Sequence, residues 1–562
     1  MQSRHFKFWP KGKPYTLPSL DCSVLENLLR SAERYTDHAA IIYYDSPISY
    51  RDLRDQSLSL GFFLKSQFNV ETGDRVLLYM QNSPQFVIGY YGILAAGAVV
   101  VPVNPMNKSA ELEYMISDTH AEVMLAGQEV VNFALPLLKT TSLKKIIYTN
   151  YADYLLHDTD LELPSEVTQT RKSFALSELI DWQNTVHGNA QPPTQFSKLD
   201  DWCVIPYSSG STGQPRGCIH SNRTVNANIS AYANWRSLAK NAPILASLPL
   251  FHVTGMQNSM NVTIYSGGTI VLMTRWNSAV AAKLIQRYKI VQWRAISTMI
   301  IDFVSSIKIS NYDLSSLEFI GGGGAQLPST VAEKLKRLTA LEAIDGYGLT
   351  ESMAALHINP PHAPKTQCLG IPLFGVDTKI INPQTHLELG VGEIGEIISR
   401  GPQIFLGYLG DNEATKNAFI NIDRKRYFRT GDLGYYDEDG YYFYVDRLKR
   451  MINVSGFKVW PTEIESILHK HPDIREVCVI AKTDSRQGET VKALIVLEDN
   501  VQLCAETIKE WCHTKMASYK VPRAYKFVES LPRSGSGKLE WRKIQEKENC
   551  SDLVENLLDA IY

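Results

Sequence analysis

Short apolar runs alternate with longer amphipathic segments over the first 450 residues of the chain. The segment 84–97 has the pattern of a buried helix, and eight apolar runs predict strands, at 74–80, 99–105, 122–127, 145–149, 244–250, 267–273, 291–297 and 316–324. Continuous apolar strands separated by helices are typical of parallel sheets that are covered on both faces. These strands are too many for one ordinary sheet, so we expect an α/β domain of two stacked α/β subdomains.

The pattern changes in the last third of the chain. Hairpin-like strands with turns rich in Gly, Asp and Asn predict a small β-barrel at about 367–446. A small α+β pattern follows and predicts a separate C-terminal domain. We therefore expect an N-terminal domain over 1–446 and a C-terminal domain over 447–562. The polar segment 150–198 is interpreted as a surface excursion on the first domain.

Composition limits the classes of partner and compartment. The formal net charge is −2 in 562 residues, so no basic excess favours a nucleic-acid partner. The eight cysteines are scattered without a C-x-x-C pair, which favours a reducing compartment, and we expect a cytoplasmic protein. The uncharged stretch 86–103 is better explained by a helix that runs into a buried strand than by a membrane span. Peripheral membrane contact and a homodimer stay open.

One loop has the composition of a phosphate-binding device. In the segment 207–217 (YSSGSTGQPRG), seven of eleven residues are Ser, Thr or Gly, and the segment follows an apolar run. Glycines allow successive backbone N–H groups to surround an anion, and Arg216 adds a positive charge. The pattern is not a Walker A motif. Its composition alone fits a flexible surface loop equally well.

Further candidate residues are spread over the rest of the chain. Thr350 and Glu351 follow a glycine turn, and a carboxylate beside a phosphate loop could bind Mg²⁺. Asp432, expected on a tight turn, could accept both hydroxyls of a ribose, and Arg447 follows fifteen residues later. Lys538 lies in a Ser/Gly loop near the C-terminus. Any one of these residues by itself would ordinarily be a solvated surface group.

Taken together, the motif-bearing segments resemble one family. Five occur in order, at 207–217, 346–352, 429–450, 453–465 and 531–543. This arrangement resembles the adenylate-forming superfamily, which includes acyl-CoA synthetases, adenylation domains of peptide synthetases and firefly luciferase. The segments FWPKG, LPLFHVTGM and RLKRMINVSGFKVWP are most similar to those of bacterial medium- and long-chain fatty acid CoA ligases.

The resemblance implies activation of a carboxylic acid with ATP and Mg²⁺ to an acyl-adenylate, followed by transfer to CoA. It implies catalytic roles for Lys538, Thr350, Glu351, which binds the metal, and Arg216, where most family members have lysine. The implied ATP and AMP contacts are Ser208, Ser209, Gly210, Ser211, Thr212, Gly213, Ala325, Asp345, Gly346, Tyr347, Thr350, Asp432, Arg447 and Lys538.

The resemblance also implies an acyl pocket, a CoA tunnel and a mobile C-terminal domain. The acyl pocket would be bordered by His252, Met256, Asn258 and the glycine run Gly321 to Gly324, of which Gly323 and Gly324 are the expected substrate contacts. Without the resemblance, His252 would be interpreted as an aromatic ring packed in the core. The CoA tunnel would be lined by Ser455, Gly456, Phe457 and Lys458, and Lys449 would be the hinge. No pocket residue indicates a charged partner, so an apolar acid, medium- or long-chain, is favoured. An aryl-acid CoA ligase, an acyl-AMP ligase that loads a carrier protein, and a catalytically inactive nucleotide-binding protein remain alternatives.

Overall fold

The chain forms two compact units in a computed structural model. One unit comprises Met1–Thr378 and Ser399–Phe428, and the other comprises Lys379–Ile398 and Arg429–Tyr562. The structure describes residues 4–18, 20–188, 190–193, 195–208, 215–236, 241–322, 329–454, 457–484, 488–499, 501–533 and 539–549.

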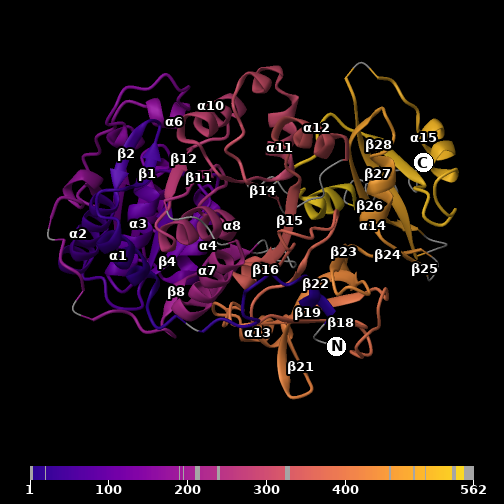
Figure 1. Cartoon of the computed structure of the whole chain (residues 1–562), viewed down its shortest axis with the longest axis horizontal. Helices are drawn as coiled ribbons and strands as arrows, with labels where there is room; N and C mark the ends of the chain where they lie inside the picture. Colours follow the sequence, from indigo (N-terminus) through magenta and orange to yellow (C-terminus); the bar gives the residue numbers. More distant parts are fainter. Residues whose placement is uncertain are drawn as a thin grey trace. The chain divides into compact units, whose positions relative to one another are not determined.

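The first sheet of the first unit contains the four apolar runs nearest the N-terminus, together with strands from later in the chain (Figure 1). Its strands follow the order β20 (Gly407–Tyr408), β10 (Arg216–Ser221), β8 (Trp202–Val204), β4 (Val99–Val103), β3 (Arg75–Tyr79), β5 (Val123–Gly127), β6 (Lys145–Thr149) and β7 (Leu179–Asp181), with β9 (Tyr207–Ser208) paired to β10. The strands from β4 to β7 run parallel, as the continuous apolar pattern predicts.

Helices cover both faces of this sheet. Leu112 and Ile116 of α4 (Ser109–Thr119) join the apolar core on one face. On the other face lies α3 (Pro84–Ala95), whose Gly89 leaves so little room that a Cβ would lie 2.9 Å from Leu78. Ser83 caps α3 by accepting a hydrogen bond from the third residue of the helix. The stretch 86–103 is therefore a buried helix that leads into β4, and no helix among the described residues is long and apolar enough to span a bilayer.

A second sheet of the same unit supplies the strand ends that matter for the site. Its order is β17 (Ile371–Pro372), β16 (Ala354–Ile358), β15 (Ala343–Leu349), β14 (Phe319–Gly322), β13 (Gln292–Arg294), β11 (Pro243–Ala246), β12 (Thr269–Leu272), β1 (Ala39–Tyr43) and β2 (Ser46–Ser49). From β1 to β15 the neighbouring strands are parallel, so their carboxyl ends share one edge.

The remaining α-helices of the first unit connect these strands in the usual α/β manner. They are α1 (Val24–Arg34), α2 (Tyr50–Phe68), α5 (Val131–Ala134), α6 (Ser165–Thr168), α7 (Asn222–Arg236), α8 (Val253–Gly255), α9 (Val262–Tyr265), α10 (Ser278–Tyr288), α11 (Ser297–Ser305), α12 (Ser329–Thr339) and α13 (Asn412–Asn417).

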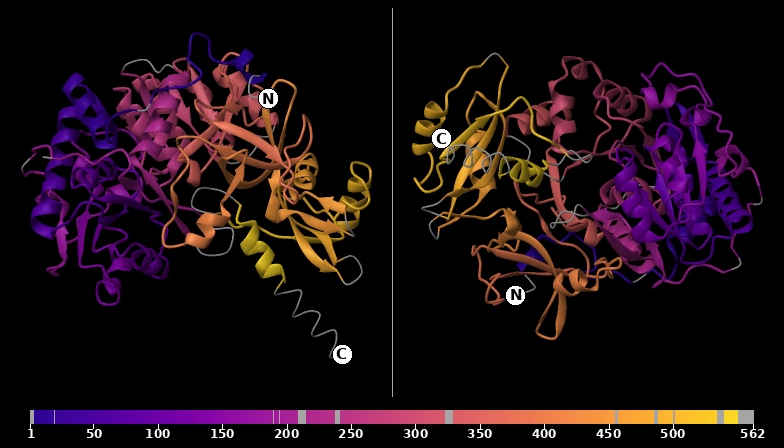
Figure 2. Two further views of the ribbon diagram at one scale, coloured as in Figure 1. Left: turned by 90° about the horizontal axis from the view of Figure 1, so that it is seen from below. Right: turned by 180° about the vertical axis from the view of Figure 1, so that it is seen from behind.

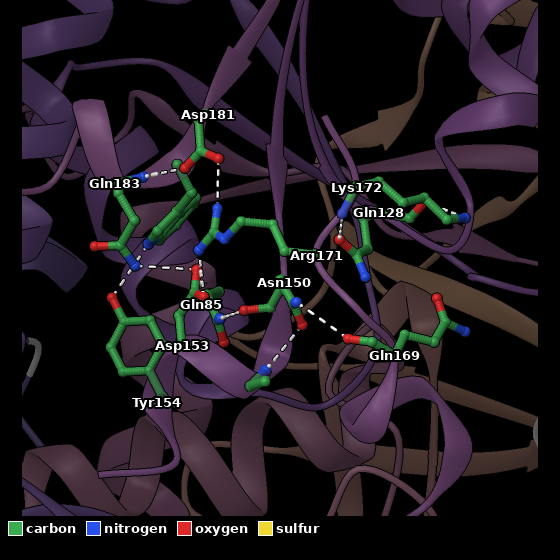
Figure 3. Close-up of polar contacts among 12 residues, drawn as sticks. Gln85, Gln128, Asn150, Asp153, Tyr154, Gln169, Arg171, Lys172, Asp181 and Gln183 are labelled. Atoms are coloured by element: carbon green, nitrogen blue, oxygen red, sulfur yellow. Dashed lines mark hydrogen bonds and ion pairs between the residues drawn. The ribbon is translucent and has the colours of Figure 1, made fainter. Parts of the chain in front are cut away.

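The segment 150–198 is more ordered than a plain surface excursion. It adds β7 to the edge of the first sheet, next to β6. Arg171 forms ion pairs with both Asp153 and Asp181, and the amide of Gln183 donates to Asp153 at 3.0 Å (Figure 3). This arginine therefore ties two separate parts of the segment together.

The region predicted as a β-barrel forms a five-stranded sheet. Its order is β18 (Asp377–Ile381), β19 (Gly395–Arg400), β22 (Lys425–Tyr436) and β21 (Phe419–Ile422), with β23 (Tyr442–Arg447) paired to β22. The pairings of β22 with β21 and with β23 are antiparallel, as the hairpin pattern predicts.

The C-terminal α+β part of the second unit, orange to yellow in Figure 2, combines a sheet with helices. Its buried apolar residues form a core of their own. Its sheet has the order β25 (Phe457–Val459), β24 (Ile452–Val454), β27 (Gly488–Leu497) and β26 (Ile474–Asp484), with β28 (Ala524–Phe527) beside β27. Apolar residues of α14 (Pro461–Leu468) and α15 (Ala505–His513) pack on one face, and Ile544 of the helix at 541–549 packs on the other. The expected fold class is confirmed; the domain boundary at 446/447 stays a prediction.

Candidate active site

The two ends of the predicted phosphate loop are held side by side. β9 enters the loop and β10 leaves it, and their antiparallel pairing sets Ser208 opposite Arg216. Gly217 follows, where a Cβ would lie 2.8 Å from Ile205. Ser209, Gly210, Ser211, Thr212 and Gly213 lie outside the described residues. The described ends thus form a short hairpin, and Arg216 supplies a cation where the chain leaves the loop.

Arg216 is held by residues of the segment around β20. Its Nε lies 3.3 Å from Oδ2 of Asp411, and its guanidinium carbon lies 5.4 Å from the ring centroid of Tyr408. Both partners belong to the same unit as the loop. The guanidinium is therefore oriented by a carboxylate on one side and an aromatic ring on another.

Glu351 is a buried carboxylate with a defined donor. It belongs to the 3₁₀ turn η7 (Thr350–Ser352), and Tyr408 donates a hydrogen bond from Oη to its Oε1 at 2.9 Å. Burial, together with the charge of Glu351, raises the pKa of Tyr408, so the phenol keeps its proton and acts as the donor. Tyr408 thereby contacts both the predicted metal ligand and Arg216.

A buried histidine joins the phosphate-loop strand to the turn that carries Glu351. Nε2 of His220, on β10, lies 2.9 Å from the backbone oxygen of Thr350, and its Nδ1 lies 3.1 Å from Oγ1 of Thr224. A carbonyl oxygen can only accept, so Nε2 carries the proton. Burial lowers the pKa of His220 to about 4, which keeps the ring neutral at pH 7.

The predicted adenine segment lies on β15 at the shared strand edge. Gly346 and Tyr347 are on this strand, and the backbone of Asp345 pairs with Gly322 of β14. The ring of Tyr347 is buried beside His357, with 5.5 Å between ring centroids. The side chain of Asp345 and all of Ala325 lie outside the described part of the chain.

The predicted acyl-pocket residues gather at the start of one helical stretch. The ring of His252 accepts a hydrogen bond from the N–H of Thr254 at 3.5 Å and so caps α8. Met256 and Asn258 follow on η5 (Met256–Asn261), and both are buried. Gly323 and Gly324 fall outside the described residues.

The predicted ribose ligands are paired in the second unit. Asp432 is buried on β22, opposite Arg447 on β23, and Nε of Arg447 lies 2.7 Å from its Oδ1. The expectation that Asp432 occupies a tight turn is wrong: it lies within a twelve-residue strand. The preceding Gly431 has a φ of +69°, and this glycine-favouring conformation explains the turn-like sequence.

The predicted hinge lies next to a fixed arginine. Lys449 is exposed in η8 (Leu448–Arg450). Arg450 is almost buried, and its Nη2 lies 2.5 Å from Oε1 of Glu465 on α14. Lys538, Ser455 and Gly456 fall in undescribed segments, as do the side chains of Phe457 and Lys458, whose backbone forms part of β25.

Sequence reasoning missed His220, Tyr408 and Asp411 as parts of the site. These residues lie outside the recognised glycine-rich segments, and their partners are far away along the chain. Sequence reasoning also did not single out Arg294, although an arginine within the apolar run 291–297 is a visible irregularity.

Comparisons with known proteins identify the family of the chain. The family model described as "AMP-binding enzyme" matches residues 28–409, and the model "AMP-binding enzyme C-terminal domain" matches residues 463–538. The long-chain-fatty-acid–CoA ligase of Bacillus subtilis (strain 168) is 32% identical over 555 residues, which is 96% of this chain and 97% of that protein.

Other similar proteins are named for aromatic acids. A probable 4-coumarate–CoA ligase of Dictyostelium discoideum is 31% identical over 484 residues, covering 84% of this chain and 86% of that protein. The structure of the anthranilate CoA ligase AuaEII in complex with anthranoyl-AMP superposes with a TM-score of 0.82 at 25% identity, over 96% of this chain and 99% of that one. The chain therefore belongs to the AMP-binding enzymes of the adenylate-forming superfamily, among relatives that include bacterial fatty acid CoA ligases.

Proposed function

We propose that this enzyme is an AMP-forming acyl-CoA synthetase. It would use ATP to convert an apolar carboxylic acid into an acyl-adenylate and would then transfer the acyl group to CoA. The names of relatives that match nearly the whole chain support this proposal. The bacterial relatives favour a medium- or long-chain fatty acid, and the coumarate and anthranilate ligases keep an aryl acid as the alternative.

The observation that carries the proposal is the contact between the phosphate-loop strand and the predicted metal turn. His220 joins β10 to Thr350, and Tyr408 contacts both Arg216 and Glu351. A contact between residues 130 apart in the sequence thus helps to bring a cation, a threonine and a carboxylate into one region. Such a set suits a triphosphate and its metal.

The attack of a carboxylate on the α-phosphate brings two anions together, so the site has to offset negative charge. The loop from Ser208 to Gly213, together with Arg216, would hold the phosphates that leave as pyrophosphate. Thr350 would contact the α-phosphate, and Lys538 would stabilise the pentavalent phosphorus.

Glu351 fits a magnesium site because Mg²⁺ is often held by one or two carboxylates together with substrate phosphates. Tyr408 holds one of its oxygens, and within the described part of the chain the other oxygen would be available to a metal ion. Among the described residues, no group of three acidic, His or Cys side chains forms a dedicated protein cage. When bound, Mg²⁺ would neutralise part of the triphosphate charge.

The second half-reaction would use the C-terminal domain. Asp432 and Arg447 would hold the ribose, and Lys449 would act as the hinge that brings Ser455 to Lys458 to the pantetheine arm. Arg450 is paired with Glu465 of α14 and also with Asp446 of β23, so a rotation at residue 449 would have to break the pair with Asp446. We expect the enzyme in the cytoplasm; a homodimer and peripheral membrane contact stay open predictions.

ATP–pyrophosphate exchange with a panel of fatty and aryl acids tests the activity. Exchange that depends on one class of acid supports the proposal, and no exchange with any acid would favour an inactive nucleotide-binding protein. Incubation with CoA or with a phosphopantetheinyl carrier protein then identifies the acceptor. Thioester formation only on the carrier would favour an acyl-AMP ligase.

A further inference from the structure

Arg294 is a buried cation at the end of a strand that is otherwise apolar. It is the last residue of β13, and it is 6% exposed. An arginine is rarely this buried unless it is paired with an acidic group. Its position therefore requires a physical explanation that the apolar character of the strand does not supply.

Two aromatic rings and one glycine shape the space around the guanidinium. Its central carbon lies 4.1 Å from the ring centroid of Phe319 on β14 and 4.5 Å from that of Tyr232 on α7. A Cβ on Gly321 would lie 2.2 Å from Nη1 of Arg294. The guanidinium thus occupies volume that only glycine at position 321 leaves available, and the rings stabilise its charge.

One edge of this guanidinium has no hydrogen-bond acceptor among the described residues. Within the described chain, Nε and Nη2 of Arg294 are buried without a hydrogen-bond acceptor, and no carboxylate forms an ion pair with the side chain. Burial lowers its pKa, yet arginine stays protonated at pH 7. Nε and Nη2 form the edge of the planar group that binds a carboxylate with two parallel hydrogen bonds. The unfilled bonding capacity therefore has the geometry of a carboxylate site.

Arg294 lies at the part of the sheet where the substrate is expected. Arg294 pairs in register with Gly321, and Gly322 pairs with Asp345 on β15. Ligands of open α/β sheets bind at the carboxyl ends of parallel strands, where these residues lie. The predicted acyl-pocket glycines follow Gly322 directly in the sequence.

We propose that Arg294 binds the second carboxylate of a dicarboxylic acid substrate, in which an apolar chain separates the two acid groups. This inference rests on the proposed acid-activating function and names the substrate class of the same site. The second carboxylate is favoured over the reacting one because a bidentate ion pair would occupy both oxygens of the nucleophile. An apolar chain is retained because Met256 and the rings beside Arg294 are apolar.

The test compares acids of equal length with one or two carboxylates, for example decanoate and decanedioate, within a series of chain lengths. Initial rates of ATP–pyrophosphate exchange give kcat/KM for each acid. We expect the wild-type enzyme to prefer the dicarboxylate. Arg294→Met, which is similar in length but uncharged, should lower kcat/KM for the dicarboxylate about 100-fold and change that for the monocarboxylate by less than about threefold, since hydrogen bonds to charged groups are the strong ones.

Arg294→Lys provides a matched control, since it keeps the charge and loses the two-pronged geometry. Its kcat/KM for the dicarboxylate should lie between those of the wild type and of Arg294→Met. Thermal unfolding of each variant checks the fold. A second readout that needs no catalysis is the rise in Tm that decanedioate produces in the wild type and not in Arg294→Met.

Several outcomes would overturn the inference. A wild-type preference for the monocarboxylate at every length would do so, and this result holds even if no variant folds. If Arg294→Met lowered kcat/KM equally for both acids, Arg294 would instead contribute to packing or bind the reacting carboxylate. Failure of the proposed function looks different, because the wild type would then show no acid-dependent exchange with either series.

Discussion

Removal of the Tyr408 hydroxyl should weaken the use of Mg²⁺ without changing the use of the acid. Tyr408→Phe deletes the 2.9 Å hydrogen bond to Oε1 of Glu351 and keeps the ring beside Arg216. The buried carboxylate then loses the donor that fixes its orientation. A metal ligand that is free to rotate binds the ion less tightly, as with other groups that orient metal ligands.

The size of this effect follows from the type of bond. A hydrogen bond to a charged group contributes about 1.5–3 kcal/mol, and a partly exposed tyrosine favours the lower half of that range. At about 1.4 kcal/mol per factor of ten, the Mg²⁺ concentration for half-maximal exchange should rise about 12- to 40-fold. The assay is ATP–pyrophosphate exchange as a function of Mg²⁺ at saturating acid.

Tyr427→Phe is the matched control. Tyr427 is buried and, like Tyr408, donates to a carboxylate; its acceptor, Asp377, lies 2.7 Å away and has no predicted role in the site. This variant should lose stability and keep the wild-type Mg²⁺ dependence. If Tyr408→Phe also left the Mg²⁺ dependence unchanged, or if both variants shifted it equally, the link from Tyr408 to a metal at Glu351 would be refuted.

Three further predictions follow from the site. Lys538→Ala should lower adenylation by about 100-fold or more, as for loss of a group that stabilises a transition state, and should spare thioester formation from supplied acyl-AMP; equal loss in both half-reactions would contradict separate sites. Lys449→Pro should block CoA transfer and leave ATP–pyrophosphate exchange intact, and normal transfer would place the hinge elsewhere. His220 has a pKa lowered by burial from 6.5 to about 4, so the unfolded state takes up its proton first and stability falls as pH drops from 6.5 towards 4, by about 3 kcal/mol for this one group. Urea unfolding at pH 7 and pH 4.5 should show that the free energy of unfolding falls less between the two pH values in His220→Gln than in the wild type. An identical fall in both proteins would refute this role of His220.

Local sequence patterns predict much of this fold and the family, but not the contacts that assemble the site. β3 to β6 follow from continuous apolar runs, which need no knowledge of distant residues. β7 was missed because its three residues lie in a polar segment and are defined by pairing with β6. Tyr408 and Arg294 were missed for a related reason. Their roles depend on partners contributed by other elements, and no periodicity in the sequence reports such partners.

The ion pair between Arg216 and Asp411 has a consequence for the release of pyrophosphate in the proposed reaction. Any phosphate that approaches this guanidinium competes with a carboxylate that already lies 3.3 Å from it. A highly charged triphosphate is favoured in that exchange, and AMP, with fewer charges, is not. Asp411 can pair with Arg216 again once pyrophosphate begins to detach. Its carboxylate would therefore favour departure of pyrophosphate over rebinding.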